Sequence, residues 1–158
     1  MDNLLDKYYG HDTSRKEKRP LIRGLGTVPW FTYSAIEYLT QFNLQDYTVF
    51  EWGSGYSYEW YVNNVRHLTS VESNIEWFNK FSKKKSSKYD PRYFKLDDYP
   101  IAINKINIDP GIIVIDGERR FDCALNAVKV FNSKMLIILD NSDWFHESAA
   151  LLREKLKV

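Results

Sequence analysis

Short apolar segments alternate with helical segments along most of the chain, and this alternation constrains the fold more than any other feature. Several of these segments are nearly continuous apolar runs, as in strands of a parallel sheet that is covered on both faces. The five expected strands are residues 47–51, 67–71, 92–96, 112–115 and 135–139. Such alternation, with right-handed crossovers, predicts a three-layer, doubly wound α/β fold with a mainly parallel sheet.

The segments before, between and after the expected strands have apolar residues at helical spacing. The expected helices are residues 30–42, 57–64, 75–84, 100–106, 119–131 and 144–156. Ser73 and Glu76 have the spacing of a capping box at the start of the third helix. Doubly wound folds bind ligands at the carboxyl ends of their strands, so we expect the site just after residues 51, 72, 97, 116 and 140.

The composition suits one soluble domain and excludes several classes of function. The chain has 158 residues, a net charge of +1 and one cysteine, which can form no internal disulfide. Its apolar runs are far shorter than the roughly 20 residues of a membrane span, and a charge near zero makes nucleic acid an unexpected partner. The N-terminus lacks the order of a signal peptide, so we expect a cytoplasmic protein. The charged residues and weak periodicity of residues 1–26 predict an N-terminal arm, which is followed by a domain over residues 27–158.

The first expected strand runs into a turn with two glycines, Gly53 and Gly55, on either side of Ser54. Glycines allow a tight turn and a close approach of the backbone to a ligand. The dinucleotide-binding fingerprint requires a third glycine that this turn lacks. Glu51 stands two residues before the first glycine, where we expect it to point into the crevice and hold a cationic amino group. The pattern therefore favours an aminoacyl ligand over a pyrophosphate.

A second acidic residue, Glu72, closes the second expected strand, 21 residues after Glu51. A carboxylate at this place can accept two hydrogen bonds from a ribose diol. The spacing is independent of the glycine turn, so it adds weight to a nucleoside-containing ligand.

These segments resemble the class I S-adenosylmethionine-dependent methyltransferases over about residues 29–145. They look closest to a small, poorly characterised subgroup in which a PWFTY helix, an FE-aromatic-GSG turn, an SVE strand end, a DG segment with a following arginine, and a DNS segment recur. The matching segments here are Pro29 to Tyr33, Phe50 to Gly55, Ser70 to Glu72, Ile115 to Gly117 with Arg119 or Arg120, and Asp140 to Ser142.

The resemblance implies a Rossmann-like methyltransferase fold with strand order 3-2-1-4-5 and S-adenosylmethionine as cofactor. By the same resemblance, residues 53–55 approach the methionine part, Glu51 faces its ammonium group and Glu72 holds the ribose. Asp97 or Asp98, after the third strand, is the matching candidate for the adenine amine. The expected activity is methyl transfer to a small-molecule substrate, at oxygen.

Oxygen-bearing side chains follow the fourth and fifth expected strands, which are neighbours in this topology. Asp116, Asp140 and Asn141 could together bind Mg²⁺, which prefers such ligands. The arrangement resembles metal-dependent O-methyltransferases of the catechol and caffeoyl type, in which the metal lowers the pKa of a substrate hydroxyl and holds its oxygen in line with the methyl group. Asp116 and Asp140 are accordingly the expected catalytic residues. The alternative is that Asp140, Ser142 or Asp143 caps the last helix and Asp116 orders its turn.

The chain also departs from the full methyltransferase pattern. Because 18 residues follow Asp140, we expect a sheet of about five strands in which strands six and seven are lacking. Residues 135–139 would then form an open edge through which two chains could pair as a homodimer. The alternative function is a non-catalytic cofactor-binding or interaction module derived from a methyltransferase.

Three further features are open to a functional or a structural interpretation. His146 could be a general base or a surface residue at a helix start, whereas Cys123 is expected to be a buried structural thiol. Aromatic side chains cluster before and after the glycine turn, and we expect them to divide between the core and a pocket wall. These are Trp30, Phe31, Tyr33, Trp52, Tyr56, Tyr58, Trp60 and Tyr61.

Overall fold

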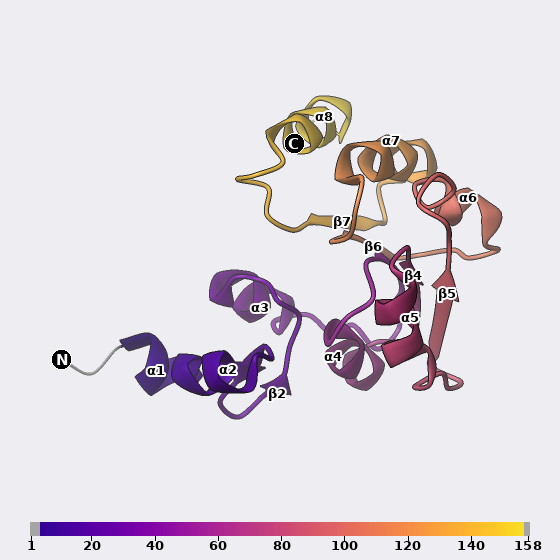
Figure 1. Cartoon of the computed structure of the whole chain (residues 1–158). Coiled ribbons are helices and arrows are strands. Elements are labelled where there is room, and N and C mark those ends of the chain that lie inside the picture. The colour runs from indigo at the N-terminus through magenta and orange to yellow at the C-terminus, as the bar shows by residue number, and fades with distance from the viewer. Residues whose placement is uncertain (1–3, 157–158) are drawn as a thin grey trace.

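A five-stranded parallel sheet forms the centre of the protein in a computed structural model that describes residues 4–156 (Figure 1). The strand order is β5-β4-β3-β6-β7, and all four neighbouring pairs are parallel. The strands are β3 (Thr48–Trp52), β4 (His67–Glu72), β5 (Tyr89–Tyr93), β6 (Ile112–Ile115) and β7 (Leu136–Leu139). Their carboxyl ends therefore share one edge of the sheet.

The structure corrects the expected strand count. We expected about five strands, with strands six and seven lacking, whereas residues 4–156 form seven strands in two sheets, and β6 and β7 are both present. The sequence did not indicate β1 (Leu21–Ile22) and β2 (Gly26–Thr27), which form a separate antiparallel pair. Each has only two residues, which is too short for the alternating pattern of a strand to be visible.

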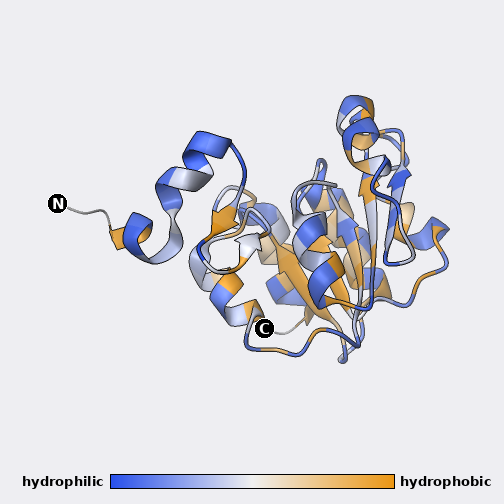
Figure 2. Ribbon diagram, turned by 90° about the horizontal axis from the view of Figure 1, so that it is seen from below, coloured by the Kyte–Doolittle hydropathy of each residue, from blue (hydrophilic) through white to orange (hydrophobic). Residues whose placement is uncertain are grey.

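Helices cover both faces of the main sheet (Figure 1). They are α3 (Tyr33–Leu39), α4 (Ser57–Asn64), α5 (Ile75–Ser82), α6 (Ala102–Lys105), α7 (Arg120–Val130) and α8 (His146–Leu156). Along β6, Ile112 and Val114 belong to the core on the α3 and α4 side, and Ile113 and Ile115 to the core on the α6, α7 and α8 side. This alternation explains why β6 is apolar at every position. Figure 2 shows hydrophobic residues concentrated in the central strands, whereas the helices carry both hydrophilic and hydrophobic residues.

Several element boundaries differ from those expected. Helix α3 begins after Thr32, whose hydroxyl accepts a hydrogen bond from the backbone N–H of Ala35, so Pro29 precedes the helix. Helix α5 is capped by Asn74, whose Oδ1 accepts from Trp77 N at 2.9 Å, instead of by the expected capping box. Strand β5 lies three residues before its expected place because it pairs with β4 from Tyr89 onward. The position of β5 depends on its pairing with β4, which a local sequence pattern does not show.

The N-terminal residues pack against the domain. They form α1 (Leu4–Tyr9), α2 (His11–Glu17), β1 and β2. The ring of Tyr9 stacks on Tyr33 of α3 at a centroid distance of 4.1 Å, and the Tyr9 hydroxyl donates to Glu37 at 2.6 Å. Arg19 forms an ion pair with Glu59 of α4 at 2.9 Å. No helix within residues 4–156 is long and apolar enough to cross a membrane.

Candidate functional site

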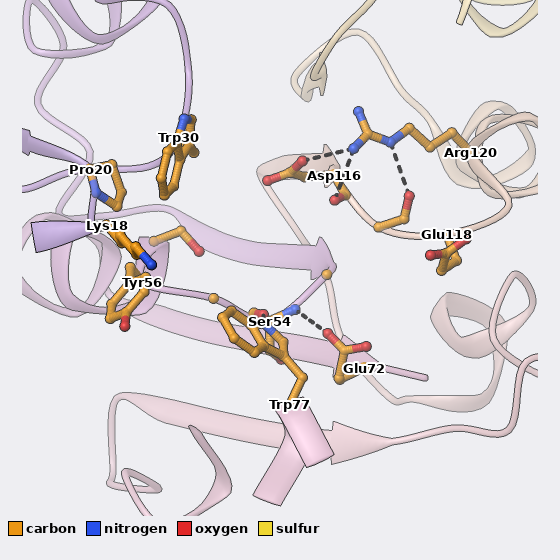
Figure 3. A pocket seen from close by; sticks show the side chains of 14 residues that line it. Lys18, Pro20, Trp30, Ser54, Tyr56, Glu72, Trp77, Asp116, Glu118 and Arg120 are labelled. Atoms are coloured by element: carbon orange, nitrogen blue, oxygen red, sulfur yellow. Dashed lines mark hydrogen bonds and ion pairs between the residues drawn. The ribbon is translucent and has the colours of Figure 1, made fainter. Parts of the chain in front are cut away.

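A cavity of about 360 Å³ lies at the carboxyl ends of β3, β4 and β6 (Figure 3). Its wall combines the glycine turn after β3, the end of β4, the start of α5, the turn before α7 and part of the N-terminal arm. The side chains labelled in Figure 3 are Lys18, Pro20, Trp30, Ser54, Tyr56, Glu72, Trp77, Asp116, Glu118 and Arg120. The cavity therefore lies at the edge of the sheet where the strand order predicts a ligand site.

The two glycines of the turn, Gly53 and Gly55, differ in backbone conformation and surroundings. Gly53 has a φ of +102°, and a Cβ built there would lie 2.9 Å from the carbonyl carbon of Asp116. The turns after β3 and β6 are thus in backbone contact, which a side chain would prevent. A Cβ at Gly55 would meet no atom nearer than Ser57 Oγ at 4.0 Å, so this glycine leaves open space beside the cavity.

Glu72 lines the cavity where its strand ends, as the sequence predicted. Its Oε2 accepts from Ser54 N at 3.1 Å, and its Oε1 accepts from Ser73 N at 2.8 Å and Asn74 N at 2.7 Å. Burial raises the pKa of this carboxyl group above its usual value, and the three backbone N–H groups partly offset that rise. A carboxylate has about four acceptor positions, so capacity remains for a ligand hydroxyl.

Glu51 does not line the cavity, although the sequence placed it facing an ammonium group there. Its side chain is fully buried and accepts from the hydroxyls of Ser57 at 2.7 Å and Ser70 at 2.5 Å. Burial raises the pKa of Glu51 to about 7, and these two hydrogen bonds limit the rise. The carboxyl group therefore links β3, β4 and α4 beneath the glycine turn.

Asp97 and Asp98 also lie outside the cavity wall. The Asp97 side chain is fully exposed, and its carboxylate is 4.0 Å from Arg119. Asp98 is half-exposed and pairs with Lys105 at 2.6 Å. Both lie in the connection beyond β5, which ends at Tyr93, so the earlier position of that strand moves them away from the predicted place.

The three predicted metal ligands come together, but around an arginine. The Arg120 guanidinium is 3.1 Å from Asp116 Oδ1 and 3.5 Å from Asp140 Oδ2, and it donates to Asn141 Oδ1 at 3.1 Å. It also donates to the backbone carbonyls of Asp116, Gly117 and Asp140. We call Arg120 and its three side-chain partners the arginine clamp.

The arginine clamp does not fit the expected Mg²⁺ ion. The guanidinium contacts both carboxylates, its side chain is only 10% exposed, and the Phe145 ring centroid lies 4.4 Å from it. Within residues 4–156 there is no group of three or more acidic, histidine or cysteine side chains suited to a metal. Burial and the adjacent Asp140 raise the pKa of Asp116 to about 8, although Arg120 opposes the rise. A fixed cation thus already occupies the place of the metal.

Sequence reasoning missed the contribution of the N-terminal arm to the site. Lys18 has a left-handed backbone conformation, with φ +50°, and its amino group faces the cavity beside Trp30 and Tyr56 (Figure 3). The sequence predicted only an N-terminal arm over residues 1–26, and nothing in it indicated that Lys18 would face the site. Trp77 was also missed, and its indole N–H donates to the Ser54 carbonyl.

The remaining candidates divide between core and surface. Trp52, Trp60 and Tyr61 of the aromatic cluster are buried in the core, whereas Trp30 and Tyr56 line the cavity. Cys123 is buried in α7, and His146 is exposed at the start of α8 without lining the cavity.

Comparison with known proteins supports the fold. No protein-family model and no curated protein matches the chain. A methyltransferase-like protein from Silicibacter pomeroyi superposes with a TM-score of 0.61 at 18% identity, covering 77% of this chain and 78% of the other. Precorrin-8W decarboxylase from Methanobacterium thermoautotrophicum superposes with a TM-score of 0.56 at 17% identity, covering 80% and 74%. The chain has a methyltransferase-like fold.

Proposed function

We propose that the protein binds S-adenosylmethionine in the cavity and transfers its methyl group to a small molecule. The observation that carries the proposal is the arrangement of Glu72, Lys18 and an open glycine turn around one cavity. Glu72 lies at the end of β4, and Lys18 faces the cavity from the N-terminal arm (Figure 3). Gly55 also lines the cavity and leaves open space where a side chain would stand. The methyltransferase-like structural neighbour supports the same reaction class.

The chain's own groups match the polar ends of such a ligand. Glu72 would accept hydrogen bonds from the ribose hydroxyls with the acceptor capacity that its backbone partners leave free. Lys18 would attract the carboxylate of the methionine part, since no hydrogen bond or ion pair within residues 4–156 engages its amino group. Glu51 is enclosed by Ser57 and Ser70, so in this proposal it supports the turn from below.

A bound sulfonium cofactor supplies an activated methyl group, so the chain has to align an acceptor and take up a proton. Asp116 lines the cavity, and one of its carboxylate oxygens is paired with Arg120. The other oxygen is the candidate proton acceptor. Asp140 lies beside Asp116, pairs with the same guanidinium and does not line the cavity. Transfer to oxygen is the finer prediction, and no metal is needed for it here because Arg120 balances the carboxylates.

Calorimetry with two related ligands tests cofactor binding. S-adenosylhomocysteine should bind with a Kd below about 1 mM, and 5′-methylthioadenosine, which lacks the aminoacyl group, should bind more weakly. Lys18→Met should weaken only the first ligand, and Lys16→Met, on the exposed part of α2, should change neither. Glu72→Gln should weaken both by about 10-fold or more. Tighter binding of a nicotinamide dinucleotide than of either ligand would contradict the proposal.

The alternative function is a cofactor-binding module without catalysis. The arginine clamp favours it, because Asp116, Asp140 and Asn141 are all engaged with Arg120. A labelled-methyl assay on hydroxylated small molecules, run with Mg²⁺ and with a chelator, separates the two functions. Product that forms equally under both conditions supports catalysis without a metal, and cofactor binding with no product in any assay supports the module.

A further inference from the structure

A second hollow, beside the cavity, lies between the start of α3 and the connection from β7 to α8. It has a volume of about 450 Å³, and we call it the aromatic groove. Trp30 lines both the aromatic groove and the cavity, and Asp140, on the groove side, contacts the Arg120 that lines the cavity. A molecule in the groove would therefore be a direct neighbour of a molecule in the cavity.

Large aromatic side chains form the exposed walls of this groove. The side chain of Trp30 is 62% exposed and that of Trp144 is 76% exposed, and the half-buried Phe31 lies among the lining residues. Neither tryptophan can owe its position to burial in the core. Exposed aromatic surface of this extent around a hollow is typical of a ligand site.

The charged side chains that line the groove are all acidic. Asp140 and Asp143 line it, and no lysine, arginine or histidine is among its described lining residues. Asp140 is already paired with Arg120, whereas Asp143 is exposed and has no hydrogen-bond or ion-pair partner within residues 4–156. One carboxylate therefore remains free to pair with a ligand. The neighbouring cavity is different, because it presents Lys18 and Arg120.

We propose that the aromatic groove binds the cationic amino group of the methyl-accepting substrate, which is therefore a small organic amine. This inference rests on the proposed function for its link to catalysis. The faces of Trp30 and Trp144 would attract the cation through their ring quadrupoles, and Asp143 would pair with its charge. A neutral molecule of the same shape gains only the apolar contact, so the groove selects by charge.

Two matched pairs of probes test this selection without the cofactor. Tyramine is compared with 4-ethylphenol, and hexylamine with hexanol, in titrations followed by tryptophan fluorescence and calorimetry. The variants are Asp143→Asn, which removes the charge at nearly constant shape, and Trp144→Ala, which removes an exposed ring. Glu147→Gln is the control, because Glu147 is an exposed acid at the start of α8 that does not line the groove.

Each amine should bind more tightly than its neutral partner. Asp143→Asn should weaken amine binding by about three- to tenfold and leave the neutral probes nearly unchanged. Trp144→Ala should weaken amine binding by a similar factor and neutral-probe binding less, whereas Glu147→Gln should have no effect. Equal binding of charged and neutral probes, no binding of either amine below about 10 mM, or equal amine affinity in all variants would each overturn the inference. Affinity for S-adenosylhomocysteine is measured separately in the same variants, so a failed cofactor proposal is distinguished from a failed groove.

Discussion

Replacing Arg120 by methionine gives the sharpest test of the arginine clamp. The change keeps an apolar stem of similar shape and removes the guanidinium with its charge, which leaves Asp116 and Asp140 as two adjacent carboxyl groups. The exposed fractions of the three side chains are 10%, 23% and 13%, so the pairs are largely shielded from solvent. Removing one partner from a buried ion pair costs about 3–5 kcal/mol. We expect Arg120→Met to lose stability within that range.

Urea unfolding measures this loss, and the neighbouring arginine is the matched control. Arg119 is 39% exposed and pairs with Asp122 on the surface, so Arg119→Met should cost less than about 1 kcal/mol. An equal loss in the two variants, or a loss below about 1 kcal/mol for Arg120→Met, would refute the idea that Arg120 holds the carboxylates together.

A second measurement on the same variant tests whether the guanidinium takes the place of a metal. Asp116, Asp140 and Asn141 keep their oxygen atoms in Arg120→Met, so Mn²⁺ should bind the variant and raise its melting temperature. Saturation at 100 times the Kd corresponds to about 2.7 kcal/mol. The wild-type protein should show no such shift. Mn²⁺ binding to the wild-type protein that Asp140→Asn abolishes would show that the metal displaces the arginine.

Three further predictions follow from other parts of the structure. Burial raises the pKa of Glu51 to about 7, so the native state keeps a proton that the unfolded chain releases, and this stabilisation is lost as pH rises from about 4.5 to 7. In urea titrations, Glu51→Gln should therefore become more stable relative to the wild-type protein between pH 5 and pH 8. A difference in unfolding free energy that stays constant over this range would contradict the prediction. Gly53→Ala should cost about 1–3 kcal/mol through its strained φ and its contact with Asp116, whereas Gly55→Ala should melt like wild type but bind S-adenosylhomocysteine more weakly. Strand β7 lies at the edge of the main sheet, so light scattering should show a dimer that Ile137→Pro reduces to a monomer, and a wild-type monomer would exclude pairing through this edge.

The main strands could be predicted because their signal is local. A strand such as β6 is apolar at four successive positions, and its two faces enter two cores, so periodicity and burial point to one interpretation. The starts of the helices could be predicted less well. Asn74 caps α5 although Ser73 and Glu76 have the right spacing, because several polar residues near a helix start can each accept the free N–H groups.

The site could be predicted only where a residue's role follows from its place on a strand. Glu72 ends β4 and lines the cavity, but Glu51 lies within β3, where the alternation of side chains turns it toward Ser57 and Ser70 beneath the turn. Lys18 reaches the cavity because long-range contacts such as the pair between Arg19 and Glu59 fix the N-terminal arm. No local pattern encodes such a contact.

Strand order predicts which side chains meet in the arginine clamp, whereas charge balance decides what binds between them. Topology alone brings the carboxyl ends of β6 and β7 together, so the meeting of Asp116, Asp140 and Asn141 follows from the strand order. Two adjacent and partly buried carboxyl groups are stabilised by a compensating positive charge or a shared proton. A divalent ion and an arginine both meet this requirement, and the sequence places Arg120 four residues after Asp116, within reach of all three side chains. Since the arginine is part of the chain, its charge is present at every metal concentration, and the carboxylates are held without any ion from solution.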